Sequence, residues 1–162
     1  MIFLHSKLIH YGFLLTLAAG LAVFSCDRVE GPLFPGLSAV APEMAQVYLY
    51  RRDAMAAYAQ GFDVIIDGKI CGQLSNASYL RLSLAPGRHL LEVAPGPRAA
   101  VIEAKVDAQP GKNMFFEFVF STGLDMQPLF HDALIANREE REAMLTLPKL
   151  REKALYLVQG AK

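Results

Sequence analysis

The feature that most restricts the fold is a series of short runs in which apolar and polar residues alternate, each ended by turn-forming residues. The clearest runs are Tyr79–Leu84, where every second residue is leucine, and Asn113–Phe120, where every second residue from Met114 is methionine or phenylalanine. A two-residue period gives each strand one apolar face. Because these faces must be buried against one another, the pattern predicts two antiparallel sheets packed face to face.

Turn residues separate the runs at regular intervals. Asp67-Gly68 is a strong hairpin signal, because both positions of the favoured two-residue turn need positive φ. Seven runs are predicted as strands, with Met126–Phe130 as a further short candidate: Val47–Arg51, Phe62–Ile66, Lys69–Leu74, Tyr79–Leu84, His89–Val93, Ala99–Ala108 and Asn113–Phe120. The small-residue stretch Asp53–Gln60 is read as either a loop or a short helix. We therefore expect a mainly β fold, an antiparallel β-sandwich of about seven strands, over residues 43–135.

Residues 136–162 change period and are expected to form a C-terminal helical segment. Asn137 followed by Glu140 resembles a capping box, and apolar residues recur at helical spacing at Leu147, Leu150, Ala154, Leu157 and Val158. Pro148 interrupts that pattern, so two short helices or one kinked helix are expected. The apolar stripe has two readings: it covers an open sheet face, or it docks on a partner or on the bilayer surface.

The first 25 residues have the features of an export signal. Lys7 is their only charged side chain, and Tyr11–Ser25 is an uncharged run that is short for a membrane-spanning helix. Val23-Phe24-Ser25-Cys26 resembles a lipobox, the site at which bacterial lipoproteins are acylated on cysteine and then cleaved before it. We expect lipidation of Cys26 and membrane attachment through that lipid. The alternative is an uncleaved signal anchor in which Cys26 is incidental.

Asp27 and the following residues bear on where the domain sits. An aspartate directly after the lipidated cysteine resembles the sorting signal that retains lipoproteins in the inner membrane of enteric bacteria. We therefore favour the periplasmic face of the inner membrane over the outer membrane, a choice that the sequence leaves open. Residues 26–42 are read as the lipidated cysteine and a flexible tether, which would hold the domain roughly 20–25 Å from its anchor.

Charge gives no indication of a nucleic-acid partner. Lys7 is the only one of the 16 Lys and Arg residues that precedes Cys26, whereas all 16 Asp and Glu residues follow it. The part after the signal is therefore close to neutral, whereas nucleic-acid binding normally requires a basic face.

Several turn and strand residues together resemble a known family. They are Val47–Arg51, Asp67-Gly68 with Gly72 and Leu74 behind it, Tyr79, Pro86-Gly87 with His89, and Gly111 before an aromatic strand. They look like those of a family of small bacterial lipoproteins that carry a domain of unknown function, similar in outline to PEGA-type β-sandwich repeats. The resemblance covers roughly residues 43–135. It implies a fold, and it brings no catalytic residues with it.

The candidates for chemistry are few. Cys71 is the only cysteine besides Cys26, and we expect a small, buried hydrophobic role for it rather than intermolecular pairing or catalysis. His131 and Asp132 are neighbours on a strand and should point to opposite faces, so they are not expected to share a ligand. No spacing typical of a zinc site is present. We predict no metal, no cofactor and no enzymatic activity.

A candidate binding face combines aromatic and cationic side chains: Tyr48, Tyr50, Arg51, Tyr79 and Arg81. If the two strands are neighbours, these residues form a platform suited to a protein partner or to sugar rings. The bland interpretation is that the tyrosines are half-buried sheet residues. The sequence thus predicts a lipid-anchored, non-catalytic interaction module of the cell envelope whose expected partner is a protein. A carbohydrate or cell-wall binding domain is the alternative, and an uncharacterised enzyme is third.

Overall fold

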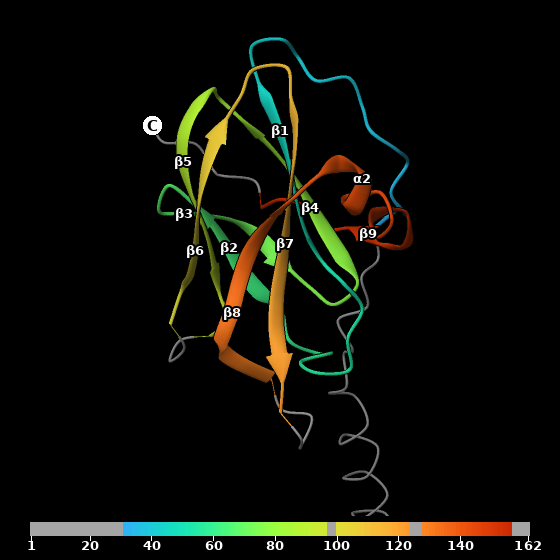
Figure 1. Ribbon diagram of the computed structural model, residues 1–162, viewed down its shortest axis with the longest axis vertical. Helices are drawn as coiled ribbons and strands as arrows, with labels where there is room; N and C mark the ends of the chain where they lie inside the picture. The colour runs from blue at the N-terminus through green and yellow to red at the C-terminus, as the bar shows by residue number, and fades with distance from the viewer. Residues whose placement is uncertain (1–30, 97–99, 124–127, 157–162) are drawn as a thin grey trace, which may run out of the picture.

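The computed structural model describes residues 31–96, 100–123 and 128–156, and in this part of the chain nine strands form two packed sheets (Figure 1). The expected mainly β sandwich is confirmed. The strands are β1 (Ala45–Arg51), β2 (Phe62–Ile66), β3 (Lys69–Leu74), β4 (Ser78–Leu84), β5 (Gly87–Ala94), β6 (Ile102–Ala108), β7 (Asn113–Thr122), β8 (Pro128–Arg138) and β9 (Arg151–Glu152).

The sequence pattern predicted only antiparallel pairs, but one of the two sheets is mixed. The five-stranded sheet has the order β8-β7-β1-β4-β9, and the four-stranded sheet has the order β3-β2-β5-β6. β1 pairs with β4 in antiparallel register but with β7 in parallel register, and β9 runs parallel to β4. Alternation fixes which face of a strand is buried and not the direction of its neighbour, so the two parallel pairs left no signal in the sequence.

The predicted hairpin at Asp67-Gly68 is confirmed. Ile66 pairs with Lys69, and the two turn residues have φ values of +50° and +76°. Such a turn suits the right-handed twist of the strands that it connects.

The main core lies between the two sheets and is built from the predicted alternating positions. The leucines of β4 and the apolar face of β7 contribute to it, as do residues from β1, β2, β5 and β6. A second apolar cluster lies on the outer face of the five-stranded sheet. We call it the outer aromatic cluster; its buried members are Phe34, Tyr48, Tyr50, Tyr79, Phe115, Ala143, Leu147 and Leu150.

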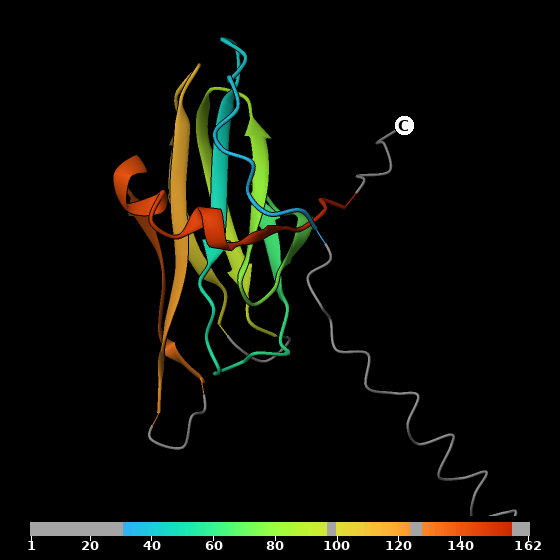
Figure 2. The same cartoon turned by 90° about the vertical axis from the view of Figure 1, so that its right-hand side faces the viewer.

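The expected C-terminal helical segment is confirmed as one short helix, and the rest of its described length is not α-helical. β8 continues to Arg138, the only α-helix among the described residues is the single turn α2 (Glu140–Ala143), and a 3₁₀ turn covers Leu147–Lys149. From Leu150 the chain is extended and pairs with β4 (Figure 2). Apolar residues three apart fit a helix, but the free edge of β4 offers hydrogen bonds that an isolated helical turn cannot match. Leu157 and Val158 lie outside the described residues.

Part of the predicted tether is packed rather than free. Phe34 is buried in the outer aromatic cluster, and its backbone N–H donates to the carbonyl of Leu150 at 3.1 Å. Leu33 forms an isolated bridge with Arg151. The signal, Cys26 and Asp27 lie outside the described residues. In the described part of the chain, no helix has the length and apolar character needed to cross a membrane.

Candidate functional site

The structure brings the predicted tyrosines together but does not expose them. Tyr50 faces Tyr79 across the β1–β4 pair, and the rings of Tyr48 and Tyr79 lie 6.3 Å apart. However, Tyr48 and Tyr79 are 1% exposed and Tyr50 is 0% exposed. The expected open binding platform is therefore a covered surface.

Two segments from opposite ends of the described chain cover these tyrosines. The ring of Phe34 lies edge-on to Tyr48 at 5.7 Å and to Tyr79 at 5.5 Å. Leu147 and Leu150 pack on the same cluster. The sequence could not indicate this burial, because the covering residues are more than 100 positions apart.

Glu152 of β9 binds the polar groups of two residues on the same face, Tyr79 and Arg81. Its carboxylate accepts a hydrogen bond from the Tyr79 hydroxyl at 3.2 Å and pairs with Arg81 Nε at 3.1 Å. Burial, and then the nearby charge of Glu152, raise the pKa of Tyr79 far above its usual value. Arg81 and Tyr79 therefore contact the protein's own C-terminal segment.

Arg51 does not belong to the tyrosine face at all. It alternates with Val47 and Leu49, so its side chain enters the core side of the sheet, where it is 1% exposed. Its guanidinium carbon lies 4.8 Å from the ring centroid of Phe62 and 5.3 Å from that of Phe120. Burial lowers the pKa of Arg51 to about 10, so the side chain remains cationic at neutral pH.

The guanidinium of Arg51 holds the connection between β1 and β2, which we call the β1–β2 loop (residues 52–61). Its two terminal nitrogens donate to the carbonyls of Ala56, Ala57 and Gln60 at 3.1, 2.8 and 2.9 Å. One buried cation thus fixes three backbone carbonyls of a segment that has no strand or helix of its own.

Hydrogen bonds to two other loops fix the two ends of the β1–β2 loop. The Asn76 carboxamide accepts from the backbone N–H of Ala54 at 3.0 Å and donates to Asp53. Gln60 donates to the carbonyl of Pro95. The loop is therefore anchored at its start, its middle and its end.

The anchored loop presents two large apolar side chains to solvent. Met55 is 78% exposed and Tyr58 is 58% exposed. Methionine and tyrosine are enriched at the centres of protein interfaces, and a preorganised loop loses little conformational entropy on binding. Of the two interpretations of Asp53–Gln60, the loop is correct. The sequence interpretation missed this loop because it grouped Arg51 with the tyrosines by residue type, although the two-residue period assigns Arg51 to the opposite face of β1.

A second charged cluster lies on the outer face of the five-stranded sheet. The buried carboxylate of Glu117 in β7 lies 2.5 Å from Arg52 Nε and 2.8 Å from Arg138 Nε. Burial and the charge of Glu117 raise the pKa of the neighbouring Tyr50 to about 12. The cluster links the end of β1 to β7 and β8, and the two arginines neutralise a carboxylate that would be costly to bury alone.

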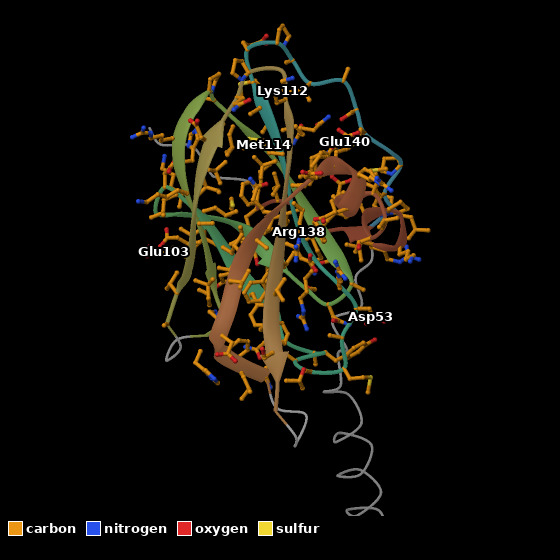
Figure 3. The ribbon with its side chains drawn as sticks, in the orientation of Figure 1. Asp53, Glu103, Lys112, Met114, Arg138 and Glu140 are labelled. Carbon is orange, nitrogen blue, oxygen red and sulfur yellow. The ribbon has the colours of Figure 1, made fainter. Side chains whose placement is uncertain are left out.

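A shallow depression of about 320 Å³ lies between the start of β7 and the end of β8. Figure 3 labels four of its lining residues, Lys112, Met114, Arg138 and Glu140. Its charged groups are of both signs, so it has no evident preference for the charge of a ligand.

The remaining candidates show no catalytic arrangement. Cys71 is partly buried against the core, as expected, and its thiol contacts the carbonyl of Val64 at 3.3 Å; burial raises its pKa to about 11, so it is protonated at neutral pH. His131 and Asp132 do meet, with 3.1 Å between Nε2 and Oδ1, contrary to expectation, because both side chains are exposed and can bend toward each other. In the described part of the chain, no three His, Cys, Asp or Glu residues gather where they could hold a metal ion.

Comparison with known proteins identifies a family. The model of a protein family of unknown function, DUF2846, matches residues 41–130, from just before β1 into β8. No curated protein and no solved structure gives a significant match.

Proposed function

Since the chain belongs to the DUF2846 family, whose function is unknown, we propose from its own residues that it is a lipid-anchored, non-catalytic interaction module of the cell envelope. Its partner in this proposal is a protein, and the β1–β2 loop is the surface that binds it. The PEGA-like relationship belongs to the same proposal; the two-sheet sandwich is compatible with it.

The lipid anchor is supported by the sequence before the domain. A short cationic start, an uncharged apolar run and Val23-Phe24-Ser25-Cys26 follow one another in the order that acylation requires. Asp27 favours retention at the periplasmic face of the inner membrane. Acyl chains on Cys26 would hold the protein stably, since each buried CH₂ contributes about 0.8 kcal/mol.

The observation that carries the binding proposal is that the β1–β2 loop has a fixed backbone and exposes apolar side chains. The side chains of Met55 and Tyr58 are largely exposed to solvent, yet a buried arginine holds the backbone between them. Exposed apolar groups on a fixed backbone are typical of protein-binding hot spots. Carbohydrate binding is less well supported, because the tyrosine platform on which it depended is covered.

The anchor is tested by metabolic labelling. Wild-type protein should incorporate radiolabelled palmitate and partition into detergent, whereas Cys26→Ser should do neither. Equal labelling of the two proteins would remove the lipoprotein part of the proposal.

The binding surface is tested by photo-crosslinking in intact cells. A photoreactive amino acid at position 58 should give a discrete crosslinked product, which Met55→Ala weakens. The same amino acid at position 145, another exposed apolar site, should not give that product. The same product from both positions would contradict a role for the β1–β2 loop.

A further inference from the structure

The two ends of the described chain meet on one edge of the sandwich, which we call the β3–β9 edge. β9 pairs with β4, the last full strand of the five-stranded sheet. The backbone N–H of Tyr156 then donates to the carbonyl of Cys71 on β3, the edge of the other sheet, at 2.8 Å. The C-terminal segment thus bridges both sheets.

The N-terminal segment joins the same edge at Gly31. The backbone N–H of Glu152 donates to the carbonyl of Pro32 at 2.9 Å, and Arg151 donates to the carbonyl of Gly31 at 3.0 Å. Gly31 approaches β9 so closely that a Cβ added there would lie 1.6 Å from the backbone carbonyl oxygen of Glu152. Figure 2 shows both described ends on its right-hand side.

The β3–β9 edge combines exposed apolar side chains with cations. The apolar residues are Leu33, Ile70, Leu155 and Tyr156, and the cationic residues along the same segments are Lys69, Arg151 and Lys153. Aliphatic and tyrosine side chains beside Lys and Arg are typical of surfaces that lie in the headgroup region of an anionic bilayer.

The length of chain before Gly31 decides which surface would face the membrane. Five residues lead from Cys26 to Gly31, so even a fully extended chain spans at most about 18 Å. An acyl anchor on Cys26 would therefore hold the β3–β9 edge beside the bilayer, and not at the end of a long flexible tether.

We propose that the β3–β9 edge is a membrane-contact surface that binds anionic phospholipid headgroups through Lys69 and Arg151 and inserts Leu155 and Tyr156 at the interface. This inference depends on the proposed lipid anchor. The β1–β2 loop lies at one end of the sandwich, off this edge (Figure 2), and stays accessible to a partner.

The absence of tryptophan from the chain allows a direct test. Tyr156→Trp places a single fluorescent probe on the edge, and Tyr58→Trp places the matched control on the β1–β2 loop. Each palmitate-labelled protein, as isolated from the membrane, is reconstituted into vesicles that contain anionic phospholipid and a headgroup-region quencher. The Tyr156→Trp protein should lose most of its fluorescence intensity, and its emission should shift to shorter wavelength. The Tyr58→Trp protein should keep its intensity and its emission wavelength.

Charge reversal tests the lipid specificity. Adding Lys69→Glu to the Tyr156→Trp protein, or replacing the anionic lipid by a neutral one, should restore fluorescence. Equal quenching of the two probes, or no quenching of either, in a protein that carries palmitate would overturn the membrane contact and leave the anchor standing. A protein without palmitate would overturn both.

Discussion

Arg51 is the residue whose environment decides most about the candidate site. A buried cation is expensive unless its donors are satisfied, and three backbone carbonyls of the β1–β2 loop satisfy the terminal nitrogens of Arg51. Because the loop has no regular structure of its own, the same three hydrogen bonds give it a defined shape. The stability of the core and the geometry of the β1–β2 loop therefore both depend on one side chain.

We predict that Arg51→Met destabilises the domain and loosens the loop. Methionine fills much of the same space but leaves three carbonyls without their donor, so the free energy of unfolding should fall by about 3 kcal/mol. Urea denaturation measures this change, and faster proteolysis within residues 52–61 reports the loop. Arg88→Met at an exposed position is the control and should cost at most about 0.5 kcal/mol. Equal stabilities of the two variants would show that Arg51 does not hold the loop.

The pair of Asp67 and His89 makes stability depend on pH. The Asp67 carboxylate lies 2.7 Å from His89 Nδ1 and raises the pKa of that imidazole. The pKa of Asp67 is in turn lowered by the hydrogen bond from the backbone N–H of Leu90 and by the side chain of His89. The contribution of His89 is present below its unfolded pKa of about 6.5 and is lost as pH rises through the folded value. The contribution of Asp67 is present above about 3.8 and is lost as pH falls through its folded value.

We therefore predict that the Asp67–His89 pair stabilises the folded domain most between about pH 3.8 and pH 6.5. The melting temperature of wild type minus that of His89→Gln should be positive near pH 5.5 and should shrink toward pH 8.5, since the imidazole then loses its proton. Thermal melts at a series of pH values measure the difference. A difference that grows toward alkaline pH would contradict the assignment.

Among the elements, those with a strict two-residue period could be predicted and the C-terminal segment could not. Leu80, Leu82 and Leu84 fix the buried face of β4 whatever lies around it. Leu147 and Leu150 fit a helical stripe as well as they fit the 3₁₀ turn and the extended segment in which they lie, because three-residue spacing is compatible with both. The free edge of β4 decides between them, and that edge exists only in the folded sheet.

The same reasoning separates what was right and wrong about the binding face. The two-residue period correctly placed Tyr48 and Tyr50 on one face of β1. It also assigns Arg51 to the opposite face, so grouping Arg51 with the tyrosines by residue type was wrong. Burial of the tyrosines depends on Phe34 and Leu150, which are distant in sequence. Local pattern therefore predicts which residues share a face and leaves open what covers it.

The cover over the outer aromatic cluster should stabilise the domain. Leu147→Ala should lower the free energy of unfolding by about 2–5 kcal/mol, because Leu147 is fully buried against this cluster. Leu145→Ala, two residues away and 70% exposed, is the matched control and should change stability by at most about 0.5 kcal/mol. Chemical denaturation of both variants checks the prediction. If both variants were as stable as wild type, the C-terminal segment would not be part of the folded unit.

At the scale of the whole molecule, the two ends of the described part of the chain act as one covering layer. Phe34 contacts Tyr48 and Tyr79, and its backbone binds Leu150. We predict that Phe34→Ala and Leu150→Ala are not additive, with a coupling free energy of about 0.5–3 kcal/mol in a double-mutant cycle. Urea denaturation of the four proteins measures it. Phe34→Ala combined with the core substitution Val106→Ala is the control and should be additive, whereas strict additivity of the first pair would mean that the two segments cover the sheet independently.

The pairing of Gly31 and Leu33 with Arg151 and Glu152 has a consequence for biosynthesis. During synthesis from the N-terminus, β1 lacks its parallel neighbour until β7 is made, and the aromatic face stays uncovered until Leu150 emerges. Contacts of such high sequence separation form slowly, since long loops must close first. We therefore expect the sandwich to finish folding only after Leu150 and β9 have been synthesised, and an unfolded polypeptide is the form that can be threaded through a narrow export channel.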